Sequence, residues 1–481
     1  MKKLISLLTV LVVTMSCSKD FIERNPISTV STEVLYKTDK DFQDAVIGIY
    51  QPFQTQYLTF WQLSDLPGDD TEQQHSAAFD LVNMNNFIIN SSLNVLSTSW
   101  LNYYQIIFRA NTVLSNIEKA DPALVTRKDR HIGEARFLRA MAYFDLVRIF
   151  GDVPMLLAPI VATEAAQKGR DKVDTIYDEV IIKDLLDAET KLPEKYTGTD
   201  VGRATKGAAR ALLGKVYLTR KDFARAEAKL KEVTTMGYSL LPNFNDLWDY
   251  SKDEHHAEYI YDIEYVDGGL GLGSTFSNIF APNLSQIINF FGLKGAGGQN
   301  GSPTEGLFSL YGPTDKRKAI SVAHVIDGLV DRNGTFIPMT PIDATSYTKK
   351  YMSTLVNPND SKANWKVIRY ADVLLMYAEA LNENGKTAEA LTVLNQVRAR
   401  AGVPAYTGLG QAETRDRIYT ERRLELYLEG QRWFDLVRTG RALPVLEKQG
   451  MKPYMTVFPI PLNQIQVINN PTIFPQNPGY D

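Results

Sequence analysis

The sequence predicts a mainly α-helical protein built from packed helix pairs, with an irregular, loop-rich second lobe that contains short strands. Apolar residues recur at helical spacing over much of 39–237 and 370–439. Between 238 and 364 the pattern changes, and aromatic, β-prone stretches such as 259–265 alternate with segments rich in Gly, Asn, Ser and Pro. The apolar content of 44% is ample for a large core.

The N-terminus has the composition of an export signal. Basic residues precede a run of about ten apolar residues, which is too short to span a bilayer as a permanent helix. Cys17, the only cysteine, follows this run, and residues 14–17 resemble a bacterial lipobox, in which the thiol is acylated and becomes the mature N-terminus. We therefore predict a lipoprotein signal peptide over 1–16, lipidation at Cys17 and a polar tether over 17–31. The alternative is an ordinary signal peptide with an incidental cysteine.

The charge pattern excludes a nucleic-acid partner. The chain has 52 basic and 56 acidic residues and a formal net charge of −4. Nucleic-acid binding needs clustered Lys and Arg to displace counterions, whereas the basic residues here are interspersed with acids. After the signal, no apolar run approaches the ~20 residues of a membrane span, so the lipid anchor is the expected membrane contact.

Helical periodicity is clear in the predicted N-terminal helical region, 32–237. The expected helices begin at Asp39, cover 99–119, 127–150 and 173–191, and form two further segments within 203–236 that join at 220–222. Residues 62–94 lack this periodicity. They are predicted to form a long surface loop with one short helix, and loops of this length are usually functional or disordered.

Two helix pairs have the residue spacing of tetratricopeptide repeats. Small residues at the helix crossing let two helices approach closely, and larger residues fill the space beside them. The first set is Gly214, Tyr217, Ala226, Leu230 and Val233, and the same spacing returns at Ala378, Leu381, Ala390, Leu394 and Val397. We predict two tetratricopeptide-like pairs that are separated in sequence, so other helices are expected to cover their faces.

The remaining parts are an irregular lobe over 238–364 and a C-terminal region over 365–481. The C-terminal region is predicted to contain helices over 370–385 and 386–401 and a strongly charged helix over 417–439. The tail from 458 onward is rich in Pro and Asn and is predicted to be extended.

Several motifs, in this order, resemble the SusD/RagB family of surface lipoproteins, which pair with SusC-type TonB-dependent transporters in Bacteroidetes. They are EARFLRAMAYFDL at 134–146, GDVP at 151–154, RYADVLLMYAEA at 369–380, ERRLEL and QRWFDL within 421–436, and the Pro- and Asn-rich tail. Each motif alone is weak, but together they cover nearly all of the mature chain. The loops over 62–94 and 266–344 contain no motif that matches.

The resemblance implies a SusD-like α-α superhelix with tetratricopeptide-like units, and a lobe that carries ligand recognition. It implies a lipid-anchored protein on the extracellular face of the outer membrane. Such a protein binds a nutrient oligomer, most often an oligosaccharide or polysaccharide, and delivers it to a SusC-like TonB-dependent transporter.

The residues themselves predict no catalysis, no metal and no cofactor. The five histidines form neither an HExxH motif nor a Cys/His cluster, and the glycines at 269–273 lack the third glycine of a dinucleotide loop. Carboxylates such as Asp69, Asp70 and Glu72 have the composition of a glycosidase pair, but a sequence does not give their separation. Three alternatives stay open: an exported helical glycoside hydrolase or lyase, a peptide-binding member of the same family, and a pure tetratricopeptide adaptor.

Sugar binding needs aromatic rings for stacking, and amides or charged groups for directional hydrogen bonds. Residues of these types gather around the two loops that have no family motif. The candidate ligand-binding residues are Trp61, Asp70, Gln74, His75 and Phe79 at the first loop, and Asn289, Phe290, Phe291 and Asn300 at the second. For any one of the aromatic residues, the alternative is a place in the core of the lobe.

Overall fold

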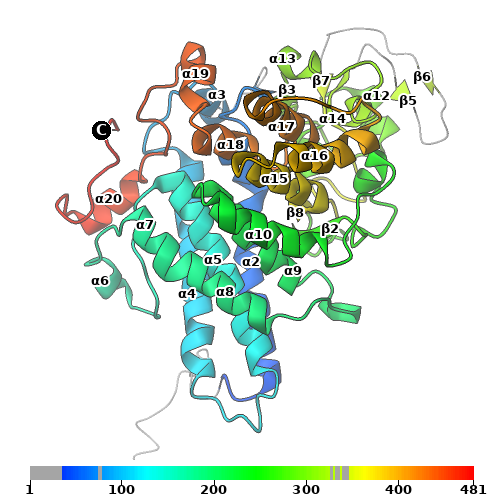
Figure 1. Ribbon diagram of the computed structural model, residues 1–481. Coiled ribbons are helices and arrows are strands. Elements are labelled where there is room, and N and C mark those ends of the chain that lie inside the picture. The colour runs from blue at the N-terminus through cyan, green and yellow to red at the C-terminus, as the bar shows by residue number, and fades with distance from the viewer. Residues whose placement is uncertain (1–34, 74–78, 325–328, 331–335, 338–345, 481) are drawn as a thin grey trace, which may run out of the picture.

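The structure is a computed structural model that describes residues 35–73, 79–324, 329–330, 336–337 and 346–480. Helices dominate it and the strands are short, which confirms the predicted fold class (Figure 1). The predicted signal peptide, the tether with Cys17, and Gln74 and His75 lie outside the described residues. None of the described helices is both long enough and apolar enough to cross a bilayer.

Three long helices form the N-terminal part of the scaffold: α2 (Asp39–Ser64), α4 (Asn94–Ile117) and α5 (Lys128–Phe150). The α2 helix begins where Thr38 caps it, because the Thr38 side chain accepts the Asp41 N–H while the Asp41 carboxylate accepts the Thr38 N–H. Phe42, Val46 and Ile49 recur along its buried face. The α4 helix begins at Asn94, a turn and a half before the predicted start.

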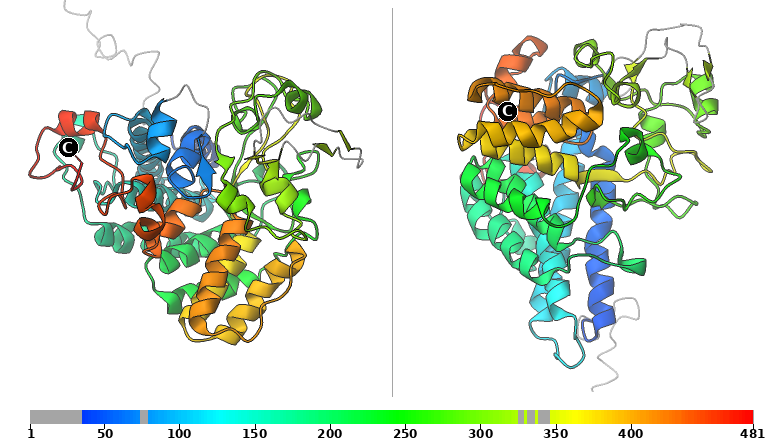
Figure 2. Two further views of the ribbon diagram at one scale, coloured as in Figure 1. Left: turned by 90° about the horizontal axis from the view of Figure 1, so that it is seen from above. Right: turned by 45° about the vertical axis from the view of Figure 1, so that its right-hand side comes forward.

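The predicted helix pairs pack against each other in space. The order of packing runs α5, α8 (Ile182–Lys191), α9 (Lys206–Thr219), α10 (Phe223–Thr234), α15 (Tyr370–Glu383) and α16 (Thr387–Ala401). A helical turn α7 (Val173–Ile176) and a π-helical turn (Tyr177–Ile181) lead into α8. Because α10 lies directly on α15, the two tetratricopeptide-like pairs stack although the whole lobe separates them in sequence (Figure 2).

Gly214 lies where α9 crosses α10 and provides a sharp test of this packing. A Cβ at this position would be 2.6 Å from Leu230 Cδ2, and Leu230 is fully buried. Gly214→Ala is therefore expected to lower the free energy of unfolding by about 1–3 kcal/mol, although alanine is the better helix former. Gly48 in α2 has nothing within 4 Å of its Cβ position, so Gly48→Ala should raise stability by about 0.5–1 kcal/mol. Urea denaturation of both variants measures this difference in sign, and a stabilised Gly214→Ala protein would contradict the packing.

The lobe (residues 238–364) contains small two-stranded ribbons and short helices. Strand β2 (Tyr259–Ile263) pairs antiparallel with β8 (Trp365–Arg369), and this ribbon joins the lobe to the helical scaffold. The other ribbons are β1 (Thr71–Glu72) with β3 (Ser302–Pro303), β4 (Ala323–His324) with β7 (Ser346–Tyr347), and β5 (Leu329–Val330) with β6 (Phe336–Ile337). The short helices of the lobe are α11 (Phe276–Ile279), α12 (Ser285–Phe290), α13 (Glu305–Phe308) and α14 (Lys318–Ser321), with a 3-10 turn at Phe244–Trp248. Outside the lobe lie the short helices α3 (Phe79–Asn85) and α6 (Ala162–Ala165) and 3-10 turns at Gly198–Asp200 and Glu447–Gln449.

The charged segment predicted as one helix over 417–439 is two helices, α17 (Gln411–Glu425) and α18 (Arg432–Arg438). The break is a turn in which Leu428 and Gly430 have φ values of 56° and 77°. This turn directs the carbonyls of Glu425 and Tyr427 onto the buried Lys350 ammonium (3.2 and 2.7 Å). The single-helix prediction is wrong because these tertiary partners satisfy the backbone groups that a continuous helix would use.

The prediction that the tail from 458 is extended is wrong over one segment, because residues Leu462–Ile468 form the helix α20. The preceding helix, α19 (Ala442–Leu446), ends before the tail begins. Beyond α20 the chain is irregular, and Asn477 fixes it by donating to the carbonyls of Phe150 (2.9 Å) and Phe458 (2.7 Å). The chain end is thereby attached to the C-terminus of α5.

Candidate ligand-binding site

The first predicted loop is fastened to the C-terminal helices through its acidic residues. Asp70 is 1% exposed and its carboxylate contacts Arg423 Nε in α17, while Arg432 Nε in α18 lies 2.7 Å from Asp69 Oδ1 and 3.4 Å from Asp70 Oδ2. Burial raises the pKa of Asp70 above its ordinary value, and the guanidinium groups of Arg432 and Arg423 oppose this rise. The prediction that Asp70 contacts ligand is therefore corrected: it anchors the loop.

Trp61 is also part of the interior rather than the ligand face. The α2 helix continues past it to Ser64, so its indole enters the lobe core, where it is 1% exposed. Its ring lies edge-on to Phe280 with 5.5 Å between the ring centroids. This corrects the prediction of Trp61 as a stacking platform, because a ligand has no access to a ring at that depth.

The two predicted ligand loops meet at the β1–β3 ribbon. Thr71 pairs with Pro303, and the Thr304 N–H donates to the Asp70 carbonyl (3.0 Å). Beside this ribbon, the Gln73 side-chain amide donates to Asn300 Oδ1 (2.9 Å). The structure thus brings Asn300 to the first loop. Gln73 was missed by the sequence reasoning, although the neighbouring Gln74 has the same hydrogen-bonding chemistry.

Phe79 is an exposed aromatic side chain on α3, the short helix whose last residue, Asn85, accepts the Gln73 N–H (3.1 Å). It is the first residue of α3 and is 80% exposed. An exposed ring of this kind supplies the flat apolar face that packs against a sugar ring. Phe79 is therefore the predicted aromatic residue whose position fits ligand contact.

The remaining candidates lie on α12, at the outer side of the lobe. Asn289 is exposed, and Phe290 and Phe291 are half-buried with their rings edge to face and centroids 4.9 Å apart. Figure 1 shows α12 well separated from α3. The structure therefore does not gather Phe79 and the α12 residues around one small ligand.

A polar pair that sequence reasoning did not find lies near β3. His324 Nε2 is 3.1 Å from Glu305 Oε1, and the Glu305 side chain is 73% exposed. The Phe308 ring lies 4.5 Å from the His324 ring, and Lys318 Nζ lies 4.0 Å above the same phenyl ring. These residues combine an aromatic surface with an accessible acceptor. The sequence spacing gave no sign of this pair, because His324 is positioned by the pairing of β4 with β7.

The backbone N–H groups of the glycine run in the second loop are hydrogen-bonded to a side chain of the protein. The N–H groups of Gly268 and Gly269 both donate to Asp360 Oδ2, at 3.0 and 2.7 Å. A backbone arrangement of this kind can bind an anion, and here the anion is the carboxylate of the chain's own Asp360.

Over the described part of the chain, no three His, Cys, Asp or Glu side chains converge in a way that could hold a metal ion.

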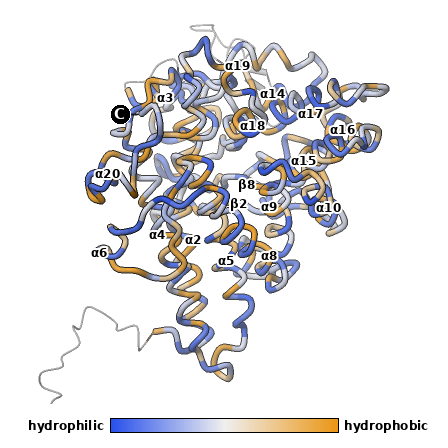
Figure 3. Tube along the Cα trace, turned by 60° about the vertical axis from the view of Figure 1, so that its left-hand side comes forward, coloured by the Kyte–Doolittle hydropathy of each residue, from blue (hydrophilic) through white to orange (hydrophobic). Residues whose placement is uncertain are grey.

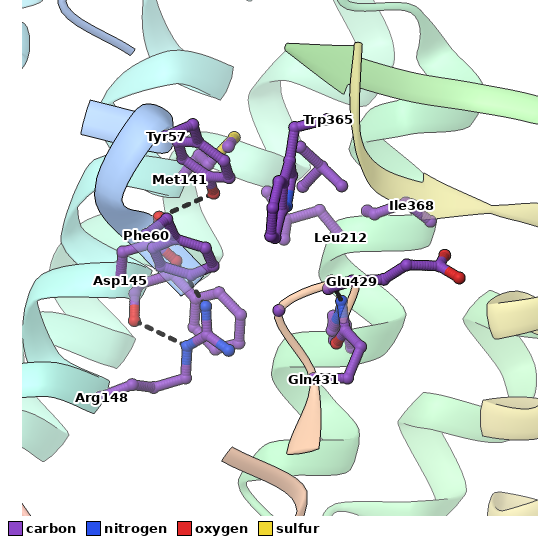
Figure 4. Close-up of a pocket in the computed structure, with 14 residues that line it drawn as sticks. Tyr57, Phe60, Met141, Asp145, Arg148, Leu212, Trp365, Ile368, Glu429 and Gln431 are labelled. Carbon is purple, nitrogen blue, oxygen red and sulfur yellow. Dashed lines mark hydrogen bonds and ion pairs between the residues drawn. The ribbon is translucent and has the colours of Figure 1, made fainter. Parts of the chain in front are cut away.

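An interior cavity lies between α2, α5, α9 and β8 (Figure 4). Tyr57 Oη donates to Asp145 Oδ2 (2.9 Å) at its wall, and Arg148 pairs with the same carboxylate. Its volume of about 20 Å³ accommodates a single water molecule. This cavity belongs to the packing of the scaffold, because ligand pockets are more than ten times larger.

Two larger hollows differ in polarity. The first, about 310 Å³, is an apolar groove between α4, the segment that carries α6, and α20; it includes Trp100, Phe108 and Val467, and Figure 3 shows apolar stretches in these elements. The second, about 810 Å³, has a mixed polar and apolar lining and lies between residues 194–205, Arg210 of α9, residues 235–238 just after α10 and the segment 253–260. A polyhydroxylated ligand matches the second in chemistry.

Two protein-family models match the chain. Residues 339–480 match the model described as "SusD family", and residues 20–218 match the model described as "Starch-binding associating with outer membrane". The chain belongs to the SusD/RagB family. The family resemblance of the sequence motifs is thereby confirmed, and the matches extend over both the N-terminal helices and the C-terminal region.

Individual relatives agree with this assignment over nearly the full length. A SusD-like protein of Formosa agariphila is 28% identical, and the match covers 99% of both chains. The starch-binding protein SusD of Bacteroides thetaiotaomicron is 23% identical over 88% of this chain and 86% of its own. A solved structure titled "Laminarin binding SusD-like protein" superposes with a TM-score of 0.77 at 28% identity, covering 92% of this chain and 100% of that one.

Proposed function

We propose that this SusD/RagB protein is a cell-surface lipoprotein that binds an oligosaccharide or polysaccharide and delivers it to a SusC-like TonB-dependent transporter. The observation that carries the binding role is the exposed Phe79 ring at the start of α3. The last residue of this short helix, Asn85, accepts the N–H of Gln73 (3.1 Å), and Gln73 forms the bridge to Asn300 where the two ligand loops meet. The laminarin-binding SusD-like protein, at 28% identity over 92% of this chain, supports a glycan as the ligand class. Glycan arrays and calorimetry, with peptides included, separate this proposal from the peptide-binding alternative.

The ion pairs of the first loop favour binding over hydrolysis. Asp69 and Asp70, the carboxylates with the composition of a glycosidase pair, are both bound to Arg423 and Arg432. A general acid must carry a transferable proton at the substrate, and these carboxylates instead face the guanidinium groups that fix the loop. Incubating the purified soluble domain with the bound glycan tests this, and products appearing at catalytic rates would favour the hydrolase or lyase alternative.

Phe79→Ala is expected to weaken glycan binding by roughly 2- to 12-fold, which corresponds to about 0.5–1.5 kcal/mol for one aromatic contact. Because the ring is 80% exposed, the unfolding free energy should change by less than about 0.5 kcal/mol. Calorimetric titration and urea denaturation on the same preparations give both quantities. Leu124, which is 54% exposed in the α4–α5 connection, supplies the control Leu124→Ala, which should leave affinity unchanged. Unchanged affinity of Phe79→Ala would place the ligand elsewhere.

The proposed anchor is tested by Cys17→Ala in the full chain. Without the thiol there is no acyl attachment, and stable membrane association needs more than one buried chain. The variant is expected to move from the membrane fraction to the soluble fraction while its glycan affinity stays the same. Retention at the cell surface at the normal level would contradict lipidation at Cys17.

A further inference from the structure

The cavity of about 810 Å³ lies away from the β1–β3 ribbon at which the two ligand loops meet. Its walls come from residues 194–205, Arg210 of α9, residues 235–238 just after α10 and the segment 253–260, whereas α3 and β3 lie near the top of Figure 1, above α9. Its volume is within the range of small-molecule sites, which are few in any protein. The cavity is therefore large enough for a ligand of several sugar rings.

The two arginines of the cavity wall are already paired with carboxylates behind them. Arg203 binds both carboxylate oxygens of Glu134, at 2.8 and 2.9 Å. Arg210 pairs with Glu189 (3.3 Å) and Glu232 (3.1 Å). The wall therefore offers firmly oriented N–H donors without a strong net charge, which suits a neutral ligand better than an anion.

His255, also in the cavity wall, is likewise paired with carboxylates. His255 Nδ1 lies 3.0 Å from Asp253 Oδ1, and its Nε2 lies 3.2 Å from Glu264 Oε1. The hydrogen bond to Glu264, followed by that to Asp253, raises the pKa of His255 to about 9 despite its partial burial. The imidazolium is therefore charged at neutral pH, and its two carboxylate partners more than balance its positive charge.

Three half-buried tyrosines complete the wall: Tyr196, Tyr238 and Tyr259. Each is packed against a neighbour. Arg130 lies 4.8 Å from the Tyr196 ring centroid, the Tyr370 ring lies 6.3 Å from that of Tyr238, and the His255 ring packs edge-on to Tyr259 at 4.9 Å. Fixed aromatic rings beside oriented donors are the two elements that sugar recognition uses.

Two polar atoms just beneath the wall lack partners. Tyr259 Oη and His256 Nε2 are buried and have no hydrogen bond to any residue that the structure describes. Buried polar atoms are almost always satisfied by protein or by water. Both atoms are closed off from the cavity in this conformation, so a ligand hydroxyl would reach them only after a shift of the Tyr259 or His256 side chain.

We propose that this cavity is a second binding site for a neutral oligosaccharide, separate from the ligand loops around Phe79. The inference rests on the proposed glycan-binding function and extends it from one site to two. A protein with two sites on different faces holds a long glycan at both, and the second contact then becomes intramolecular.

The proposal is tested by a larger side chain that fills the cavity, because truncating wall residues would also remove packing contacts. Val201 lines the cavity and is 38% exposed, so Val201→Trp should obstruct the cavity while the protein remains folded. Leu124→Trp, at an exposed position outside the cavity wall, is the matched control. Urea denaturation of both variants checks that the fold is retained.

Calorimetry measures the binding of laminarihexaose and of neutral hexasaccharides of mannose, xylose and galactose to wild type, Phe79→Ala, Val201→Trp and the double variant. We expect at least one of these sugars to bind Phe79→Ala. Adding Val201→Trp to that variant should weaken this residual binding at least tenfold, whereas adding Leu124→Trp should not.

The second site would be overturned if Phe79→Ala binds none of these sugars, or if the residual binding is unchanged in the double variant. Binding that Phe79→Ala does not affect but Val201→Trp abolishes supports the cavity and overturns the loop site. No binding to wild type would overturn both proposals for these sugars.

Discussion

Replacing Arg369 by methionine is expected to lower the free energy of unfolding by about 3–5 kcal/mol, the range for breaking a buried ion pair. Arg369 is 1% exposed and donates to three glutamates: Glu258 (2.8 Å), Glu425 (2.6 Å) and Glu429 (2.7 Å). Methionine fills much of the same space but leaves these buried carboxylates with fewer donors. The loss therefore measures uncompensated charge rather than a cavity.

The network around Arg369 joins the lobe to the helices. Arg317 from the lobe binds Glu421 (2.7 Å) and Glu425 (3.0 Å), and Arg400 from α16 also contacts Glu425. Burial alone would raise the pKa of Glu425, but the guanidinium groups of Arg400, Arg369 and Arg317 hold it well below its usual range. A carboxyl with a lowered folded-state pKa stabilises the protein at neutral pH, and this contribution is lost as the pH falls toward that folded-state pKa.

The matched control uses the same substitution at an exposed pair. Arg417 in α17 lies 3.2 Å from Glu413, and their side chains are 45% and 52% exposed. Arg417→Met is expected to change stability by less than about 0.5 kcal/mol. Urea denaturation at pH 7 compares the two variants. Similar small losses for both would show that the Arg369 network adds no more than a surface pair.

The helical scaffold could be predicted from the sequence because its determinants are local. Apolar spacing placed α5, α9, α10, α15 and α16 to within a few residues, and the small–large spacing around Gly214 identified the close crossing with Leu230. The break between α17 and α18 could not be predicted in this way. Its cause is the burial of Lys350, from the lobe, beneath the turn over 426–431.

The candidate site was predicted less well because composition does not reveal burial. Phe79 and Trp61 are both aromatic residues near one loop, yet one is 80% exposed and the other 1%. The difference arises from the length of α2 and from Phe280, which is far away in sequence. Likewise, Asp70 has the residue type of a sugar contact, but its arginine partners come from α17 and α18 at the other end of the chain.

Asp70→Ala is expected to lower both stability and glycan affinity, in contrast to Phe79→Ala, which lowers affinity alone. The buried Asp70 carboxylate contacts Arg423 and Arg432. When the Asp70 carboxylate is removed, both arginines still have Asp69 as a partner. The stability loss should therefore be about 3 kcal/mol, the lower end for a broken buried pair. Glycan affinity falls as well, because the loop that positions Gln73 loses its attachment to the C-terminal helices.

The indirect role of Asp70 is distinguished from direct ligand contact by its coupling to Arg423. If the pair acts by anchoring the loop, Arg423→Met should reproduce both losses, and the double variant should lose less than the sum of the single variants. Urea denaturation and calorimetric titration of the three proteins give this cycle for stability and for affinity. If Asp70→Ala instead loses affinity at full stability, and Arg423→Met does not, then Asp70 reaches the ligand in the bound state and the loop must open to allow it.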